Sequence, residues 1–168
     1  PGVSLNKDLE NYKKIFSDPR FRPDMIKIYP CSVIPNTGLY KLWKAGKYHP
    51  PTTEQLLNLI IKMKLTVPRY VRISRIIRDI PGPNIAAGNK VTSLRQNIQK
   101  KMEKRGLHCK CIRCREIGHQ LIKSLNHKII KSKLFIDEYK TLGGMEYFIS
   151  FEDVKRKTLF AFCRLRLS

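Results

Sequence analysis

Three of the chain's five cysteines lie within six residues, at Cys109, Cys111 and Cys114. Thiolates this close in sequence can converge on one metal ion, and a tight turn with cysteines at i, i+2 and i+5 can supply three corners of a zinc tetrahedron. The nearby basic residues Lys110, Arg113 and Arg115 would lower the pKa of the thiols and offset the thiolate charge. We therefore predict a bound metal at these cysteines, with zinc favoured over an iron–sulfur cluster, which prefers other spacings.

The fourth ligand of this predicted site is open, with His108, His119 and a distant cysteine as candidates. The competing interpretation treats the cysteines as buried thiols without a metal, but three cysteines in so polar a segment disfavour it. No GxGxxG, P-loop, HExxH or Ser/His/Asp arrangement occurs in the chain. Catalytic chemistry is therefore not predicted from the residues alone.

A second candidate set consists of arginines, because residues 69–81 alternate arginine with apolar side chains. This alternation predicts a strand over residues 70–74 that carries Arg72, with Arg75 and Arg78 just beyond its end. That end of a parallel sheet faces the usual binding side, where guanidinium groups can hold phosphates through paired hydrogen bonds. We predict that these three arginines contact RNA; the alternative is a solvated strand end whose arginines pair with acidic residues.

The net charge favours a polyanionic partner. The chain has 34 Lys and Arg against 13 Asp and Glu, a formal net charge of +21 in 168 residues, and the basic residues are spread over its whole length. A folded basic surface that binds nucleic acid is the expected arrangement. Tyr40, Trp43 and Tyr48 are aromatic residues that can stack on bases, although packing in the core is the favoured interpretation for them.

Composition also indicates the cellular compartment of the protein. No apolar run reaches the roughly 18–20 residues of a membrane span, and no secretory signal opens the chain. Five cysteines, an odd number, do not indicate a disulfide framework. We therefore expect an intracellular protein without a membrane segment.

Apolar spacing and capping residues predict the elements that must position these side chains. Helices are predicted at residues 4–18, 39–44, 52–65 and 93–105, and strands at 25–29, 70–74, 135–140, 146–151 and 158–165. Alternating helices and strands before residue 105 are typical of parallel α/β units, whereas the last strands, joined by a hairpin loop at 153–157, indicate an appended β unit. A junction is predicted near residues 118–133.

Several sequence blocks resemble the catalytic subunit of the Elongator complex. They are residues 18–25 (DPRFRPDM), 27–30 (KIYP), 38–44 (GLYKLWK), 72–81 (RISRIIRDIP), the cysteine cluster followed by 115–118 (REIG), and 143–153 (GGMEYFISFED). The blocks follow the order of that family and span nearly the whole chain.

The resemblance implies a fold and a reaction. It implies an α/β fold in which residues 1–107 are the later half of a radical S-adenosylmethionine partial (β/α) barrel. Residues 108–133 would be a zinc-binding linker with Cys109, Cys111 and Cys114 as ligands, and residues 134–168 the first antiparallel strands of a GNAT acetyltransferase domain. The family modifies the wobble uridine of tRNA at carbon 5, as an acetyltransferase or carboxymethyltransferase, by radical chemistry from a [4Fe–4S] cluster and S-adenosylmethionine, with acetyl-coenzyme A as the carbon donor.

The resemblance also implies partners and a compartment: tRNA, acetyl-coenzyme A, other Elongator subunits or a second copy of the chain, no membrane, and the cytoplasm. The family's CxxxCxxC cluster motif and its Gln/Arg-x-x-Gly-x-Gly coenzyme loop are both absent from this sequence. We therefore expect a piece of a longer enzyme whose cluster and acetyl-coenzyme A residues lie outside it. The competing hypotheses are a non-catalytic, zinc-stabilised RNA-binding module and, less favoured by the positive charge, an acetyltransferase of basic protein tails.

Overall fold

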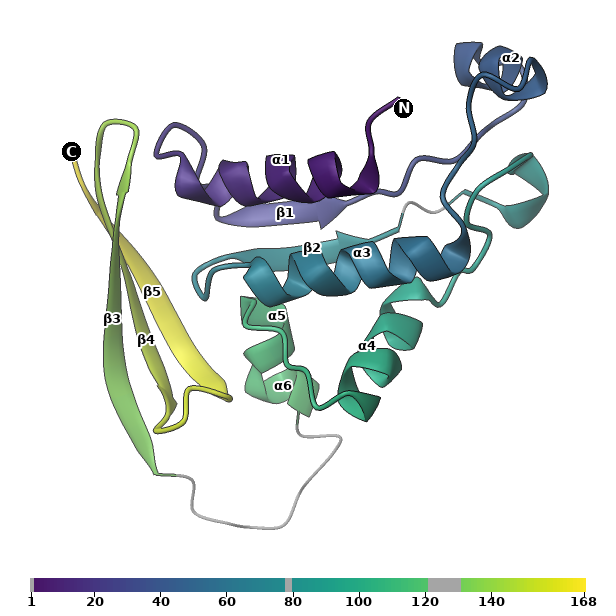
Figure 1. Cartoon of the computed structure of the whole chain (residues 1–168). Coiled ribbons are helices and arrows are strands. Elements are labelled where there is room, and N and C mark those ends of the chain that lie inside the picture. The colour runs from purple at the N-terminus through teal and green to yellow at the C-terminus, as the bar shows by residue number, and fades with distance from the viewer. Residues whose placement is uncertain (1, 78–79, 121–130) are drawn as a thin grey trace. The chain divides into compact units, whose positions relative to one another are not determined.

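The computed structural model describes residues 2–77, 80–120 and 131–168, and they form a mixed α/β fold (Figure 1). The helices are α1 (Leu5–Ser17), α2 (Gly38–Lys44), α3 (Thr53–Thr66), the 3-10 helix η1 (Gly82–Asn84), α4 (Leu94–Lys104), α5 (Ile112–Arg115) and α6 (Ile117–Gln120). The strands are β1 (Met25–Ile28), β2 (Arg72–Ile76), β3 (Ser132–Thr141), β4 (Gly144–Asp153) and β5 (Leu159–Leu167). The predicted α/β class is confirmed at this level.

The chain divides into two compact units, each built from separate stretches of sequence. The first unit contains residues Pro1–Tyr12, Lys27–Leu65 and Ser74–His108. The second unit contains Lys13–Ile26, Thr66–Ile73 and Cys109–Ser168, and it includes the cysteine cluster.

The core of the first unit is formed by the apolar faces of two amphipathic helices. Leu94, Ile98 and Met102 recur every fourth residue along α4, and each is at most 1% exposed. Ile60 and Ile61 of α3 are buried as well. At the start of α3, Thr52 and Gln55 exchange hydrogen bonds of 2.9 and 3.2 Å between side chain and backbone, which is a capping box.

Strands β1 and β2 form a two-stranded sheet and lie side by side in Figure 1. The amide of Arg72 donates to the carbonyl of Asp24 and the amide of Ile77 donates to that of Ile28, each at 2.9 Å. Both bonds advance along the two strands in the same direction, so the pairing is parallel.

Strand β2 begins two residues later than predicted, and this changes the place of Arg75. The amide of Val71 donates to the carbonyl of Pro68 at 3.2 Å, so a turn occupies the residues that were expected to open the strand. Arg75 therefore lies inside β2 and is exposed, and the expectation that it lies beyond the strand was wrong. Arg78 lies outside the described residues.

The second unit contains the antiparallel sheet β3-β4-β5. Thr141 pairs with Gly144, so β3 and β4 are joined by a two-residue turn. The hairpin loop predicted between the last two strands is confirmed: the carboxylate of Asp153 accepts from the amides of Lys155 and Lys157 at 3.0 and 2.6 Å, and also from the amide of Thr158. All three strands are longer than predicted.

One face of this sheet is buried and carries polar groups. Phe148, Ser150 and Glu152 alternate along β4 toward the same side, and each is 0% exposed. A fully buried carboxylate on a strand requires hydrogen-bond or ion-pair partners.

Two features of the helices differ from the sequence analysis. The four-residue helices α5 and α6 were not predicted, because a single turn has no hydrophobic period to detect. The prediction that Tyr40 and Trp43 pack in the core was wrong, since α2 has no buried residue.

Within the described residues, no helix combines the length and the apolar character needed to cross a membrane.

Candidate metal centre and its supports

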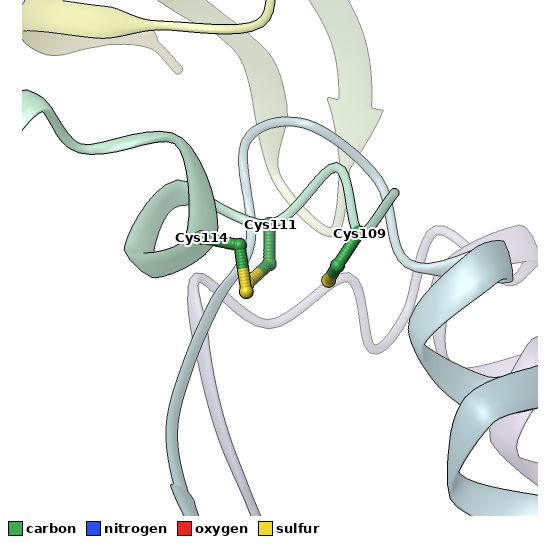
Figure 2. A group of neighbouring side chains, drawn as sticks. All are labelled: Cys109, Cys111 and Cys114. Atoms are coloured by element: carbon green, nitrogen blue, oxygen red, sulfur yellow. The ribbon is translucent and has the colours of Figure 1, made fainter. Parts of the chain in front are cut away.

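The three clustered cysteines bring their sulfur atoms together. The Sγ atoms of Cys109, Cys111 and Cys114 all lie within 4.8 Å of one another. Figure 2 shows the three side chains pointing to the same side of the loop. A zinc ion with Zn–S bonds of about 2.3 Å and tetrahedral angles separates its sulfur ligands by about 3.8 Å. The three thiol groups therefore fit a zinc ion once the distances between their sulfur atoms change by up to about an ångström.

The loop gains this shape from a change of backbone conformation at Cys111. Cys111 is extended, with φ −63° and ψ 154°, and α5 begins at the next residue. The amide of Cys114 donates to the carbonyl of Cys111 at 3.1 Å, which folds the two cysteines toward each other. Ile112 is 0% exposed, and its amide donates to the carbonyl of Val71 at 2.9 Å. The loop is thus fixed to the segment that precedes β2.

Arg115, directly after the last cysteine, is a second support of the loop. Its guanidinium is 3% exposed and donates from Nε to the carbonyl of Lys110 at 2.7 Å, and from Nη2 to the carbonyl of Arg69 at 2.8 Å. Lys110 lies between Cys109 and Cys111. Arg115 therefore holds the peptide that separates two of the three thiols.

The remaining nitrogen of that guanidinium reaches the buried carboxylate of β4. Arg115 Nη1 lies 2.6 Å from Glu152 Oε2. Glu152 also accepts from Ser150 Oγ at 2.8 Å and from Arg156 Nε at 3.3 Å. Burial alone would raise the pKa of Glu152, but the hydrogen bonds from Arg156, Arg115 and Ser150 together lower it below the ordinary value. The carboxylate is therefore ionised at neutral pH and is shared by the arginines around it.

Two more arginines surround this carboxylate. Arg156 pairs with Asp137 on β3, and this pairing raises the pKa of the Arg156 guanidinium. Arg69 lies 3.9 Å from Glu152 and donates to the carbonyl of Arg156 at 2.8 Å. Burial, followed by the nearby charges of Arg115 and Arg156, lowers the pKa of Arg69. This network joins the cysteine loop to the antiparallel sheet.

Arg164 of β5 forms a separate connection within the second unit. It donates to the carbonyl of Tyr70 at 2.6 Å and forms an ion pair with Asp24. The rings of Tyr70 and Tyr139 stack with their centroids 3.7 Å apart. Burial is the first cause of the raised pKa of both tyrosines, and it lowers the pKa of Arg164.

The histidine candidates for a fourth ligand do not join the three sulfurs. Among the described residues, the only group that can hold a metal consists of the three cysteines. His119 instead lies 3.6 Å from Glu116, and its side chain is 46% exposed. His108 is exposed and outside the group. The described residues therefore supply three ligands and leave the fourth position to another group.

The predicted RNA-contacting arginines have different surroundings. Arg72 forms a two-point ion pair with Glu116, in which Nη2 donates to Oε2 at 3.0 Å. For Arg72 the structure therefore matches the alternative interpretation, in which an arginine pairs with an acidic residue. Arg75 is exposed on β2, and Arg78 falls outside the described part of the chain.

Sequence reasoning missed Arg115 and Glu152 as supports of the cysteine loop. Two signals were present in the sequence. Arg115 directly follows the last cysteine, and Glu152 occupies a position whose alternation with Phe148 and Ser150 places it on the inner face of its strand. Neither signal identifies the partner, because the two residues are far apart in sequence.

Comparison with known proteins shows what the chain is similar to. Residues 23–104 match the model of the radical SAM C-terminal domain. The chain is 47% identical, over 99% of its length, to the tRNA uridine(34) acetyltransferase of Methanocaldococcus jannaschii, of which it covers 31%. It is 37% identical, over 99% of its length, to human Elongator complex protein 3, of which it covers 30%.

A solved structure gives the same result. The archaeal Methanocaldococcus infernus Elp3 with an N-terminal deletion superimposes with a TM-score of 0.90 at 46% identity, over 99% of this chain and 39% of that chain. The chain spans about a third of the length of the curated relatives it matches. Over nearly its whole length, the chain is similar to a segment of the tRNA uridine(34) acetyltransferases and of Elongator complex protein 3.

Proposed function

We propose that this chain is part of an acyltransferase that acts on tRNA and modifies carbon 5 of the wobble uridine. The observation that carries the proposal is the similarity to a tRNA uridine(34) acetyltransferase, at 47% identity over 99% of the chain. The net charge of +21 supports an RNA substrate, because phosphates attract a basic surface at long range.

The proposed domain organisation follows the predicted boundaries. Residues 1–107 are the later part of a radical S-adenosylmethionine barrel, which the family match at residues 23–104 and the parallel pairing of β1 with β2 support. Residues 108–133 are the metal-binding linker. Residues 134–168 open a GNAT acetyltransferase domain, a proposal supported by the antiparallel order β3-β4-β5.

The cofactors of the complete enzyme are proposed on the same basis. A [4Fe–4S] cluster with S-adenosylmethionine supplies radical chemistry, and acetyl-coenzyme A supplies the added carbons. The contribution of this chain is to bind RNA and to hold its own segments in a fixed arrangement. We also propose the cytoplasm as its compartment, and other Elongator subunits or a second copy of the chain as partners.

Zinc is the proposed metal at Cys109, Cys111 and Cys114, with a structural role. Thiolates favour zinc, and the three sulfurs already lie within 4.8 Å of one another. Ile112 and Arg115 tie the loop to the segment before β2 and to β4, so a metal there would stabilise the connection between linker and sheet.

The proposed RNA contacts are Arg72, Arg75 and Arg78. Arg75 is the best supported by its surroundings because it is exposed on β2. Arg72 shares its guanidinium with Glu116, so a phosphate would have to compete with that carboxylate or use the remaining donors.

The activity is tested with the full-length protein, supplied with iron–sulfur cluster, S-adenosylmethionine, acetyl-coenzyme A and unmodified tRNA. Mass analysis of the recovered nucleosides should show a modified uridine at position 34. Recovery of unmodified uridine by a protein with a complete cluster would contradict the proposal. Retained tRNA binding in that case would favour the non-catalytic RNA-binding module.

A further inference from the structure

The short helix α2 leaves its aromatic side chains half-buried and its basic side chains exposed. None of its seven residues is buried, and Leu42 is 45% exposed. Tyr40 and Trp43 are half-buried, while Lys41 and Lys44 are exposed. Figure 1 shows α2 standing apart from α3 and α4. Packing in the core therefore does not explain the residues of this helix.

Local hydrogen bonds hold α2 in place at both ends. The amide of Tyr40 donates to Thr37 Oγ1 at 3.2 Å, and that hydroxyl donates to the carbonyl of Ile34 at 2.7 Å. At the other end, Gly46 has φ +69°, and the amide of Lys47 donates to the carbonyl of Leu42 at 2.9 Å. This is a Schellman motif. An isolated helix of two turns is unstable in water, so such capping fixes a surface that would otherwise fray.

Two half-buried aromatic side chains and an exposed lysine of α2 form a compact surface, which we call the α2 surface and define as Tyr40, Trp43 and Lys44. The rings of Tyr40 and Trp43 lie with their centroids 5.7 Å apart, as expected for residues three apart on a helix. Lys44 Nζ lies 5.0 Å from the centroid of the Tyr40 ring. Two aromatic rings and an ammonium group therefore converge on one side of the helix.

The stretch of sequence that contains α2 carries charge of one sign. Residues 25–53 contain no Asp or Glu, and they contain four lysines: Lys27, Lys41, Lys44 and Lys47. A partner rich in positive charge would be repelled, and a partner with negative charge would be attracted.

We propose that the α2 surface stacks on an unpaired nucleotide of the RNA substrate. The proposal rests on the proposed function, which supplies the RNA, and adds the place where a single base is held. A nucleotide combines a flat π surface with a phosphate, and these match an indole ring flanked by lysines. Stacking on an aromatic side chain needs no particular base, whereas a duplex keeps its bases stacked internally and offers only phosphates.

Trp43 provides the readout because it is the only tryptophan of the chain. Its emission is recorded while the protein is titrated with a tRNA anticodon stem-loop, which has unpaired loop nucleotides. A blunt RNA duplex with the same number of phosphates is the matched probe. Subtracting the signal of Trp43→Phe isolates the indole. The stem-loop should quench Trp43 strongly, and the duplex should quench it weakly.

Affinity in matched variants gives the second measurement. Trp43→Leu should weaken binding of the stem-loop by about five- to a hundredfold, the range for one aromatic–base stack. Trp43→Phe should keep most of the affinity because it keeps a ring. Leu42→Ala, which changes an exposed neighbour on the same helix, should bind as the parent does. Circular dichroism checks that each variant is folded.

Each result decides the proposal. Equal stem-loop affinity of the parent and Trp43→Leu overturns the stacking role and leaves the proposed function intact, provided the parent binds tRNA. Failure of the parent to bind tRNA overturns both. An emission change that depends on protein concentration alone would show self-association through α2 and would also overturn the proposal.

Discussion

Arg115 and Glu152 form a buried ion pair, with Nη1 and Oε2 2.6 Å apart and the side chains 3% and 0% exposed. One residue directly follows the last clustered cysteine, and the other lies on β4. Because the same guanidinium also holds the carbonyl of Lys110, the pair connects the geometry of the thiols with the antiparallel sheet. A change in either residue should therefore affect both stability and the metal site.

Glu152→Gln should destabilise the fold strongly. The substitution keeps the shape of the side chain but leaves Arg115 buried without its anionic partner, and Arg156 with Asp137 alone. Removal of one partner of a buried ion pair costs about 3–5 kcal/mol. The free energy of unfolding, measured in urea, should fall by that order. Glu138→Gln, an exposed position on β3, should change it little; equal effects of the two variants would contradict a special role for Glu152.

Acid should remove this contribution of Glu152. Its pKa in the folded protein is lowered, so the carboxylate stabilises the fold above its unfolded pKa of about 4.3, and the stabilisation is lost as pH falls through the lower folded value. In the parent, stability should therefore decline below about pH 4.3. Glu152→Gln should show a shallower decline over the same range. Parallel curves for the parent and the variant would show that Glu152 does not titrate with a lowered pKa.

The sequence predicted those elements whose hydrophobic period extends over several turns or residues. Helices α3 and α4 lie within about two residues of their predicted ends because capping and apolar spacing are local signals. The start of β2 was misplaced by the turn at Pro68, which competes with the strand. For the site, spacing alone brought the three cysteines together as a candidate set. The pairing of Arg115 with Glu152 depends on tertiary structure and has no local pattern.

Zinc content provides a direct test of the cysteine cluster. Purified protein should contain about one zinc ion per chain, and Cys111→Ser should lower that content, because a hydroxyl is a poor zinc ligand. Mass spectrometry under native conditions measures both. Cys163→Ser, which changes an exposed cysteine on β5, is the control and should keep the metal. Unchanged thermal stability after complete zinc removal would rule out a structural metal here.

Arg115→Lys should weaken zinc binding although Arg115 is not a ligand. A lysine keeps the charge but cannot donate to Lys110, Arg69 and Glu152 at once, so the peptide between Cys109 and Cys111 loses its support. Loss of a group that orients metal ligands typically lowers affinity by about 10- to 100-fold. Competition with a chelator measures the dissociation constant. Arg113→Lys is the matched control; an equal loss there would indicate a general effect of basic residues near the thiols.

The salt dependence of tRNA binding tests whether Arg75 contacts a phosphate. If Arg75 neutralises one phosphate, Arg75→Gln should reduce the slope of log affinity against log salt by about 0.7–0.9. Arg20→Gln removes the same charge from an exposed arginine that lies 2.6 Å from Asp18, a pairing that lowers the pKa of Asp18 to about 2. Because Arg20 is occupied by this carboxylate, its substitution should leave the slope nearly unchanged. Arg72→Gln should combine a smaller change in slope with lower stability, since it removes the ion pair with Glu116. If Arg75→Gln and Arg20→Gln have the same slope of log affinity against log salt, Arg75 does not contact a phosphate.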